Sequence, residues 1–189
     1  MSSGEIDAVN TPTNAYYNAC YNSEFHDMLG IRQYGWTFPT SSTTPTVSNL
    51  SPRVRNSTKI SLLSSGLTSS TWCQVAYSNP CMLDVNATTY SMSCEVYIHS
   101  DTTLGFSDIT ATLGYTDMAG NRTSRADAAV DITKLGQWQT VTVTGIAPDS
   151  SAKGVRVEFW VKTSSSGKGG HVEWTQPYLT PFSTVGALS

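Results

Sequence analysis

The sequence predicts an all-β protein built as one antiparallel β-sandwich. Eight segments alternate apolar and polar side chains, and Gly, Pro, Ser and Asn separate them. Residues 14–29 alone could hold a helix of any length, and their Asn, Tyr and Cys are weak helix formers. At 189 residues the chain is long enough for one well-buried domain and short for two.

The predicted strands follow one another with turn residues between them, as in antiparallel sandwiches. The clearest reversal is at residues 117–121, where Gly120 and Asn121 can supply positive φ between two extended runs. Trp36, Trp72 and Trp174 are expected to close the core or its edges, and Trp138 to pack at a sandwich edge. The strands are predicted at residues 59–64, 72–77, 90–99, 109–116, 128–132, 138–144, 155–162 and 172–179.

The strand at 155–162 defines two faces, because side chains alternate with period two. Its apolar set is expected to face the core: Val155, Val157, Phe159 and Val161. The other set carries charge and a tryptophan: Arg156, Glu158, Trp160 and Lys162.

The ends of the chain differ from its middle in composition. They are small and polar without alternation, and such segments normally fray. We predict an N-terminal arm at residues 1–20, the sandwich at 21–180 and a C-terminal tail at 181–189. The first residues lack the basic-then-apolar layout of a secretory signal, so either a signal was removed or the protein is not exported by that route.

Composition excludes several classes of function. The net charge is −3 with 13% charged residues, which does not fit a nucleic-acid partner that needs a basic patch. No run approaches the roughly 18 apolar residues of a membrane helix. Neither nucleic-acid binding nor membrane insertion is expected.

Four cysteines show no paired metal-ligand spacing, so a zinc site is not expected. Cys94 lies on the apolar side of its predicted strand and should be a buried thiol. Cys73 and Cys81 flank a Tyr-Ser-Asn-Pro turn. They could be two thiols or a disulfide across a hairpin, which requires Cα atoms within about 7 Å.

Aromatic rings on a polar sheet face point to sugar binding, because pyranose C–H groups stack on rings while carboxylates accept hydroxyls. Trp160 lies between Glu158 and Lys162, and Tyr97 alternates with Glu95 and a histidine. We predict a glycan-binding face made of Trp160, Glu158, Tyr97 and Glu95. The alternative is that Trp160 and Tyr97 pair across strands or lie under a loop.

Catalysis is not expected. His26, His99 and His171 stand in unrelated settings, and the last two are expected to be surface residues at strand ends. Glu95, Glu158 and Glu173 could form a glycosidase pair only if two of them lay about 5–9 Å apart, which alternation alone does not place. No nucleophile elbow, phosphate loop or His-Glu-x-x-His motif occurs.

The order of short motifs resembles the jelly-roll carbohydrate-binding modules that accompany cellulases and xylanases. The resemblance spans residues 22–179 and implies a jelly-roll sandwich. The motifs that carry it are Asn22-Ser23-Glu24-Phe25, Tyr34-Gly35-Trp36, Lys59-Ile60-Ser61-Leu62, residues 90–96, Gly136-Gln137-Trp138, residues 155–161 and 172–179.

The chain departs from that family at two points. Thr175-Gln176 stand where the family usually carries an Asp pair that helps hold a structural calcium, which weighs against calcium. The family's modules normally follow a signal peptide and are joined to a catalytic domain, and neither is expected from this sequence. Similar jelly rolls that stand alone and begin at a methionine occur in tailed bacteriophages as capsid decoration, fibre and tail proteins.

The sequence therefore predicts a non-enzymatic attachment protein of a phage virion, located on a capsid or tail. Its expected partners are capsid or tail proteins, copies of itself and a host surface glycan, with the arms making the protein contacts. The alternative is a secreted carbohydrate-binding module of a polysaccharide-degrading enzyme. An independent glycosidase or lyase is the third hypothesis.

Overall fold

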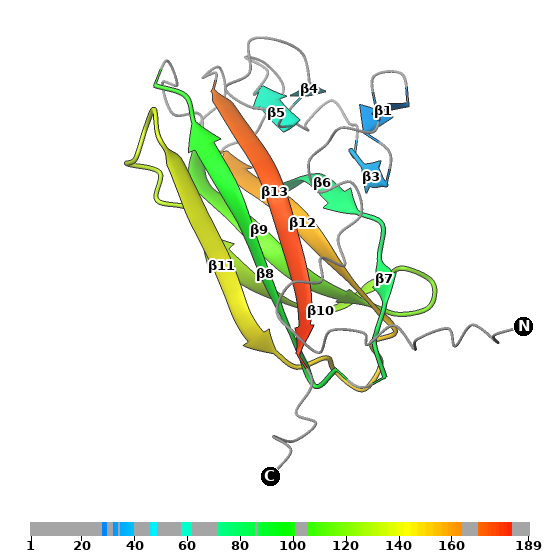
Figure 1. Ribbon diagram of the computed structural model, residues 1–189. Helices are drawn as coiled ribbons and strands as arrows, with labels where there is room; N and C mark the ends of the chain where they lie inside the picture. Colours follow the sequence, from blue (N-terminus) through cyan, green and yellow to red (C-terminus); the bar gives the residue numbers. More distant parts are fainter. Residues whose placement is uncertain are drawn as a thin grey trace, which may run out of the picture.

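The described part of the chain is a β-sandwich, two antiparallel sheets packed face to face (Figure 1). The computed structural model describes residues 28–29, 32–33, 35–39, 46–48, 58–61, 72–85, 87–100, 106–163 and 170–182. These residues contain strands, turns and bends but no helix, and so no helix that could cross a membrane. The predicted all-β fold is confirmed.

The first sheet has six strands in the order β10-β9-β12-β6-β3, and β7 also pairs with β12. Its long central strand, β12, pairs with β9 along its whole length and with β6 and then β7 on its other side. The strands are β3 (Trp36–Thr37), β6 (Trp72–Ser78), β7 (Cys81–Met82), β9 (Phe106–Thr116), β10 (Arg122–Ala129) and β12 (Gly154–Thr163).

The second sheet has five strands in the order β11-β8-β13-β5-β4. The chain changes sheet after β3, β5, β7, β8, β10, β11 and β12, so neighbours in sequence rarely pair. The strands are β4 (Thr46–Ser48), β5 (Thr58–Ser61), β8 (Thr89–Ile98), β11 (Trp138–Ile146) and β13 (His171–Phe182). A separate two-stranded ribbon pairs β1 (Met28–Leu29) with β2 (Arg32–Gln33).

The core is built around a stack of three aromatic rings between the sheets. Phe159 of β12 stacks on Trp36 of β3 with ring centroids 5.3 Å apart and on Trp174 of β13 at 4.4 Å. Phe159 and Trp174 are completely buried. The predicted inward set of β12 is buried as expected, and Trp36 and Trp174 are confirmed as core residues.

The reversal predicted at residues 117–121 is confirmed as the turn between β9 and β10. The Asp117 carboxylate accepts hydrogen bonds from the backbone N–H groups of Ala119 and Asn121, each at 2.9 Å. A hydrogen bond from the Asn121 side chain, together with these backbone bonds, lowers the pKa of Asp117. Gly120 has a φ of 82°, a backbone conformation that favours glycine.

Three sequence-based boundaries were wrong. The strand expected at residues 128–132 is β10, which ends at Ala129, and Asp131 opens a turn by accepting hydrogen bonds from the Thr133 N–H and hydroxyl. β10 is an edge strand with polar side chains on both faces, so it lacks the apolar alternation that identifies a strand. Met28–Leu29 form β1 rather than the end of a helix. Pro181 and Phe182, the first two residues of the tail predicted at 181–189, belong to the last strand, β13. The rest of the helical segment, the arm at 1–20, residues 183–189 and residues 62–64 lie outside the described residues.

The disulfide hypothesis for Cys73 and Cys81 is not supported, since both residues are thiols. Cys73 pairs with Val161 and Cys81 with Val155, six residues apart along β12, which corresponds to about 20 Å. The intervening turn does not reverse the chain, because β6 and β7 both run antiparallel to the same strand. Cys94 is a buried thiol, as predicted.

Candidate functional site

The four residues predicted to share one glycan-binding face lie on two different sheets. Glu158 and Trp160 belong to β12 and alternate with Phe159, so they occupy the outer face of the six-stranded sheet. Tyr97 and Glu95 belong to β8 and lie on the outer face of the five-stranded sheet. The prediction of a single face was wrong, and the two halves are on opposite sides of the sandwich.

Glu158 is completely buried although it lies on an outer face, and its carboxylate accepts three hydrogen bonds. Arg156 Nε donates to Oε1 at 2.8 Å, while Arg122 Nη1 and Trp160 Nε1 donate to Oε2 at 2.9 and 2.8 Å. The carboxylate lies directly over Gly114, where a Cβ would come within 2.6 Å of Oε1. Glu158 is therefore the centre of an internal ion-pair network.

Trp160 is covered by the same network. The guanidinium carbons of Arg122 and Arg125 lie over its ring at 5.0 and 5.5 Å from the centroid, within the range of cation–π contacts. Its indole N–H is already donated to Glu158. The groups of Trp160 that a sugar would use are engaged by the protein itself, which favours a structural role for Trp160 and Glu158.

Tyr97, from the other half of the prediction, belongs to a row of four partly exposed rings. These rings are called here the ring row: Trp138, Tyr97, His99 and His171. Tyr97 lies 5.3 Å from Trp138 in a tilted arrangement and 5.0 Å from His99, edge to face. His99 lies 5.9 Å from His171, again edge to face.

Strand register sets the ring row in place. Trp138 at the start of β11 pairs with Tyr97 of β8, and Tyr97 pairs in turn with Glu173 of β13. The backbone N–H of His99 donates to the carbonyl of His171 at 3.0 Å, which continues the ladder past the end of β8. The strands β11, β8 and β13 are neighbours in the five-stranded sheet (Figure 1). Their register places the four rings on one face of this sheet.

A buried carboxylate lies within the ring row. Glu173 is completely buried, and its Oε1 is 2.6 Å from His99 Nε2. This hydrogen bond fixes the orientation of the His99 ring, which in turn packs against Tyr97. Glu95 is two residues before Tyr97 on the same face of β8 and is partly exposed. The face therefore combines ring surfaces with the partly exposed carboxylate of Glu95, while the buried Glu173 holds the His99 ring in place.

Gly136 shapes the edge of this face next to Tyr97. It has a φ of 70°, and its N–H donates to the carbonyl of Ile98 at 2.7 Å. A Cβ at this position would lie 4.0 Å from the Tyr97 hydroxyl. The turn before β11 is thereby held against the end of β8, which places Trp138 beside Tyr97.

The sequence alone did not identify most of this site. The pattern predicts surface positions at strand ends for His99 and His171 and edge packing for Trp138. It leaves Glu173 as one of three carboxylates without a defined position. The missing information was the register of β8 against β11 and β13, which single-strand alternation does not contain.

Calcium binding at the family's usual place does not fit these residues. Thr175 is buried and Gln176 is exposed with a φ of 49°, and neither offers the carboxylates that a hard cation prefers. Within the described ranges no group of three or more His, Cys, Asp or Glu residues is placed to hold a metal ion.

No protein-family model and no curated protein matches the sequence. Solved structures match its fold. The enzymatically active domain of tailspike protein 4 from bacteriophage CBA120 matches with a TM-score of 0.57 and 14% identity, over 87% of this chain and 21% of that chain. A carbohydrate-binding module of the β-sandwich superfamily matches with a TM-score of 0.56 and 12% identity, over 79% of this chain and 58% of that chain.

A third solved structure matches over nearly the whole length of both chains. The C-terminal family 22 carbohydrate-binding module of Clostridium thermocellum Xyn10B has a TM-score of 0.50 and 14% identity, over 93% of this chain and 98% of that chain. The described fold is thus the jelly-roll β-sandwich of carbohydrate-binding modules, as the sequence motifs implied. At these identities the likeness defines the fold alone, and this chain spans about a fifth of the tailspike and 58% of the second structure.

Proposed function

We propose that this chain is a non-catalytic attachment protein that binds glycan through the ring row and the partly exposed Glu95 carboxylate beside it. The observation that carries the proposal is the set of four partly exposed rings on one outer sheet face, next to the buried Glu173. Sugar rings can stack on Tyr97 and Trp138, while carboxylate and imidazole groups bind their hydroxyls.

This proposal keeps Tyr97 and Glu95 from the sequence-based site and assigns Trp160 and Glu158 to stability. The reason is their contacts: the Glu158 carboxylate holds three donors, and Trp160 is covered by two guanidinium groups. The outer face of β8, β11 and β13 has no comparable cluster of arginines among the described residues.

We place the protein in a phage virion, on a capsid or tail, where it would contact capsid or tail proteins or copies of itself and a host glycan. The likeness to a phage tailspike domain supports this placement. The second candidate is a secreted carbohydrate-binding module of a polysaccharide-degrading enzyme, which the likeness to two such modules supports equally. Both candidates share the same glycan-binding face.

The proposal is tested by screening the purified chain on a glycan array and on immobilised polysaccharides. We expect retention by at least one glycan, with no release of reducing ends on prolonged incubation. Absence of binding to every glycan would overturn the binding role, and steady release of sugar would overturn the non-catalytic one. Attachment of the chain to virions, measured by co-sedimentation, separates the two candidates.

A further inference from the structure

The five-stranded sheet ends in an edge strand that lacks the usual protection against pairing with another chain. β11 has nine residues, and among the described strands it pairs only with β8 (Figure 1). It contains no charged residue and no proline. Native edge strands are normally kept apart by charges, prolines, short length or a covering segment, because their outward N–H and C=O groups can pair with a further strand. β11 therefore offers a surface for strand pairing.

The open part of β11 is residues 140–144, called here the open edge. Before it, the Gln139 side chain donates hydrogen bonds to two carbonyl groups of the β10–β11 turn, which holds that turn against the start of the strand. After it, the Gly145 N–H donates to Ser91 Oγ at 2.8 Å, next to a shift in register. Pairing with another strand is thus possible along the open edge, between these two contacts.

The side chains of the open edge suit a second copy of the same strand. Thr140, Thr142 and Thr144 are exposed on the outer face of the sheet, and Val141 and Val143 are buried on its inner face. When two copies pair antiparallel about Thr142, threonine lies opposite threonine and valine lies opposite valine. Cross-strand Thr–Thr pairs stabilise a sheet, whereas like charges directly opposite one another destabilise it. The open edge is therefore complementary to itself.

The other edge strands of the two sheets fit the open edge less well. β3 and β4 have only two and three residues, which is too short for a comparable ladder. β10 has eight residues but carries Arg122, Arg125 and Asp127. Within the described part of the chain, β11 is the edge strand that is both long and uncharged. Its best match among these strands is β11 of another copy.

We propose that two copies of this chain pair antiparallel through the open edge, with Thr142 of each copy opposite Thr142 of the other. The contact uses the same surface on both copies, as in a closed two-fold dimer. It joins two five-stranded sheets into one continuous sheet, and a two-fold axis perpendicular to that sheet keeps both outer faces on the same side. Two ring rows then lie on that side, each with Trp138 on the strand at the junction.

The pairing goes beyond the proposed glycan binding and does not depend on it. An edge-to-edge contact of this length is smaller than a standard interface, so we expect a weak dimer with a dissociation constant on the order of 10–100 μM. Two linked ring rows should bind a polyvalent surface more tightly than one. A monomer that binds glycan would contradict the pairing alone, and a dimer that binds no glycan would contradict the glycan proposal alone.

The test is sedimentation equilibrium of the whole chain over concentrations that bracket the expected dissociation constant. Thr142→Lys should raise that constant about fivefold, because it places two like charges directly opposite each other, and Thr142→Glu should do the same. An equimolar mixture of the two variants should associate at least as tightly as the unchanged chain. Recovery in the mixture identifies the contact, because the proposed pairing brings the lysine of one copy opposite the glutamate of the other.

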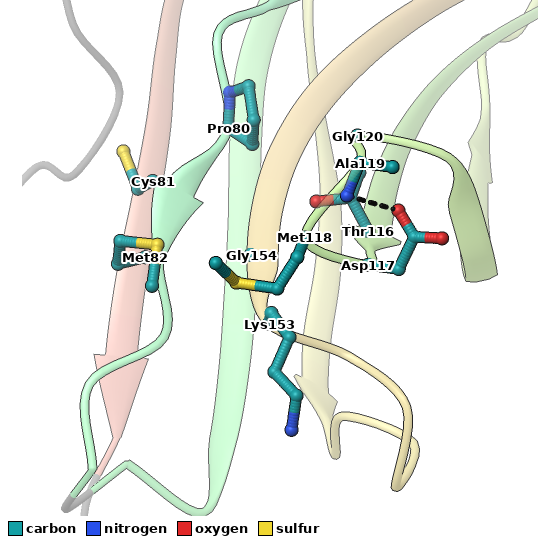
Figure 2. A pocket seen from close by; sticks show the side chains of 10 residues that line it. All are labelled: Pro80, Cys81, Met82, Thr116, Asp117, Met118, Ala119, Gly120, Lys153 and Gly154. Carbon is teal, nitrogen blue, oxygen red and sulfur yellow. Dashed lines mark hydrogen bonds between the residues drawn. The ribbon is translucent and has the colours of Figure 1, made fainter.

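Two controls separate the open edge from other surfaces. Ala129→Lys adds the same charge at an exposed position of β10, the edge strand of the other sheet, and should leave association unchanged. Met118→Ala shortens an exposed apolar side chain that lines a cavity together with Met82, a second surface through which copies could associate (Figure 2). It should also leave association unchanged. Circular dichroism of each variant checks that the fold is retained.

The proposal is wrong if the unchanged chain stays monomeric up to about 1 mM, well above the range expected for a weak interface. It is also wrong if both Thr142 variants associate as the unchanged chain does, or if their mixture stays dissociated. Loss of association in Ala129→Lys would assign the contact to β10, and loss in Met118→Ala would assign it to the cavity rim. Either result would overturn pairing through the open edge.

Discussion

Replacing Glu158 with alanine is expected to lower the free energy of unfolding by about 3–5 kcal/mol, the usual cost of removing one partner from a buried ion pair. Glu158 is fully buried and holds Arg156, Arg122 and the Trp160 indole. Its loss leaves the Arg156 guanidinium, 10% exposed, without its carboxylate. Urea denaturation followed by circular dichroism measures the change.

The matched control is Asp127→Ala, which removes another carboxylate from the same sheet face. Asp127 is 37% exposed, its Oδ2 lies 3.4 Å from Arg125 Nε, and its Oδ1 accepts a hydrogen bond from the buried Thr112 hydroxyl at 2.6 Å. An exposed ion pair contributes about 0–1 kcal/mol and a hydrogen bond about 0.5–1.5 kcal/mol, so Asp127→Ala should cost less than Glu158→Ala. If Glu158→Ala costs no more than Asp127→Ala, the ion-pair network does not stabilise the fold. In that case Glu158 becomes available again as a ligand-binding residue.

Replacing Trp138 with alanine is expected to weaken glycan binding about 30-fold. A sugar ring that covers roughly 80 Å² of the indole gains about 2 kcal/mol from apolar burial, which corresponds to that factor in the dissociation constant. Trp138 also supports Tyr97 at 5.3 Å, so its loss should disturb the neighbouring ring. Isothermal titration calorimetry with the best glycan from the array measures the effect.

Trp72→Ala is the control for this experiment. Trp72 is 41% exposed and belongs to β6 of the other sheet, where Lys162 Nζ lies 5.8 Å from its ring centroid. Its removal should leave glycan affinity unchanged. Equal losses in both variants would show that binding does not depend on the ring row.

The fold was predictable because its strands alternate so clearly. In β12 the valines and Phe159 lie in the core as expected, and the turn at Gly120 reverses the chain where expected. β10 was misplaced because an edge strand with Arg, Thr and Ser on its faces has no apolar period. Alternation identifies strands that border the core better than strands at an edge.

The site was only half predictable, for a topological reason. Alternation places Trp160 and Tyr97 on faces turned away from the core, but it does not say that β12 and β8 belong to different sheets. The charge of Glu158 also predicts a surface position, and this prediction is wrong. Glu158 is buried because Arg122, 36 residues earlier, reaches it from β10. Contacts of that range depend on pairing between distant strands.

The central claim is that glycan binds the ring row and not the face that carries Trp160. Its most direct test is a ¹⁵N NMR titration of the assigned tryptophan indole N–H signals with a glycan that the chain retains. We predict that the Trp138 indole signal shifts and saturates while that of Trp160, bonded to Glu158, does not move. A saturating shift of the Trp160 signal with an unmoved Trp138 signal would contradict the account.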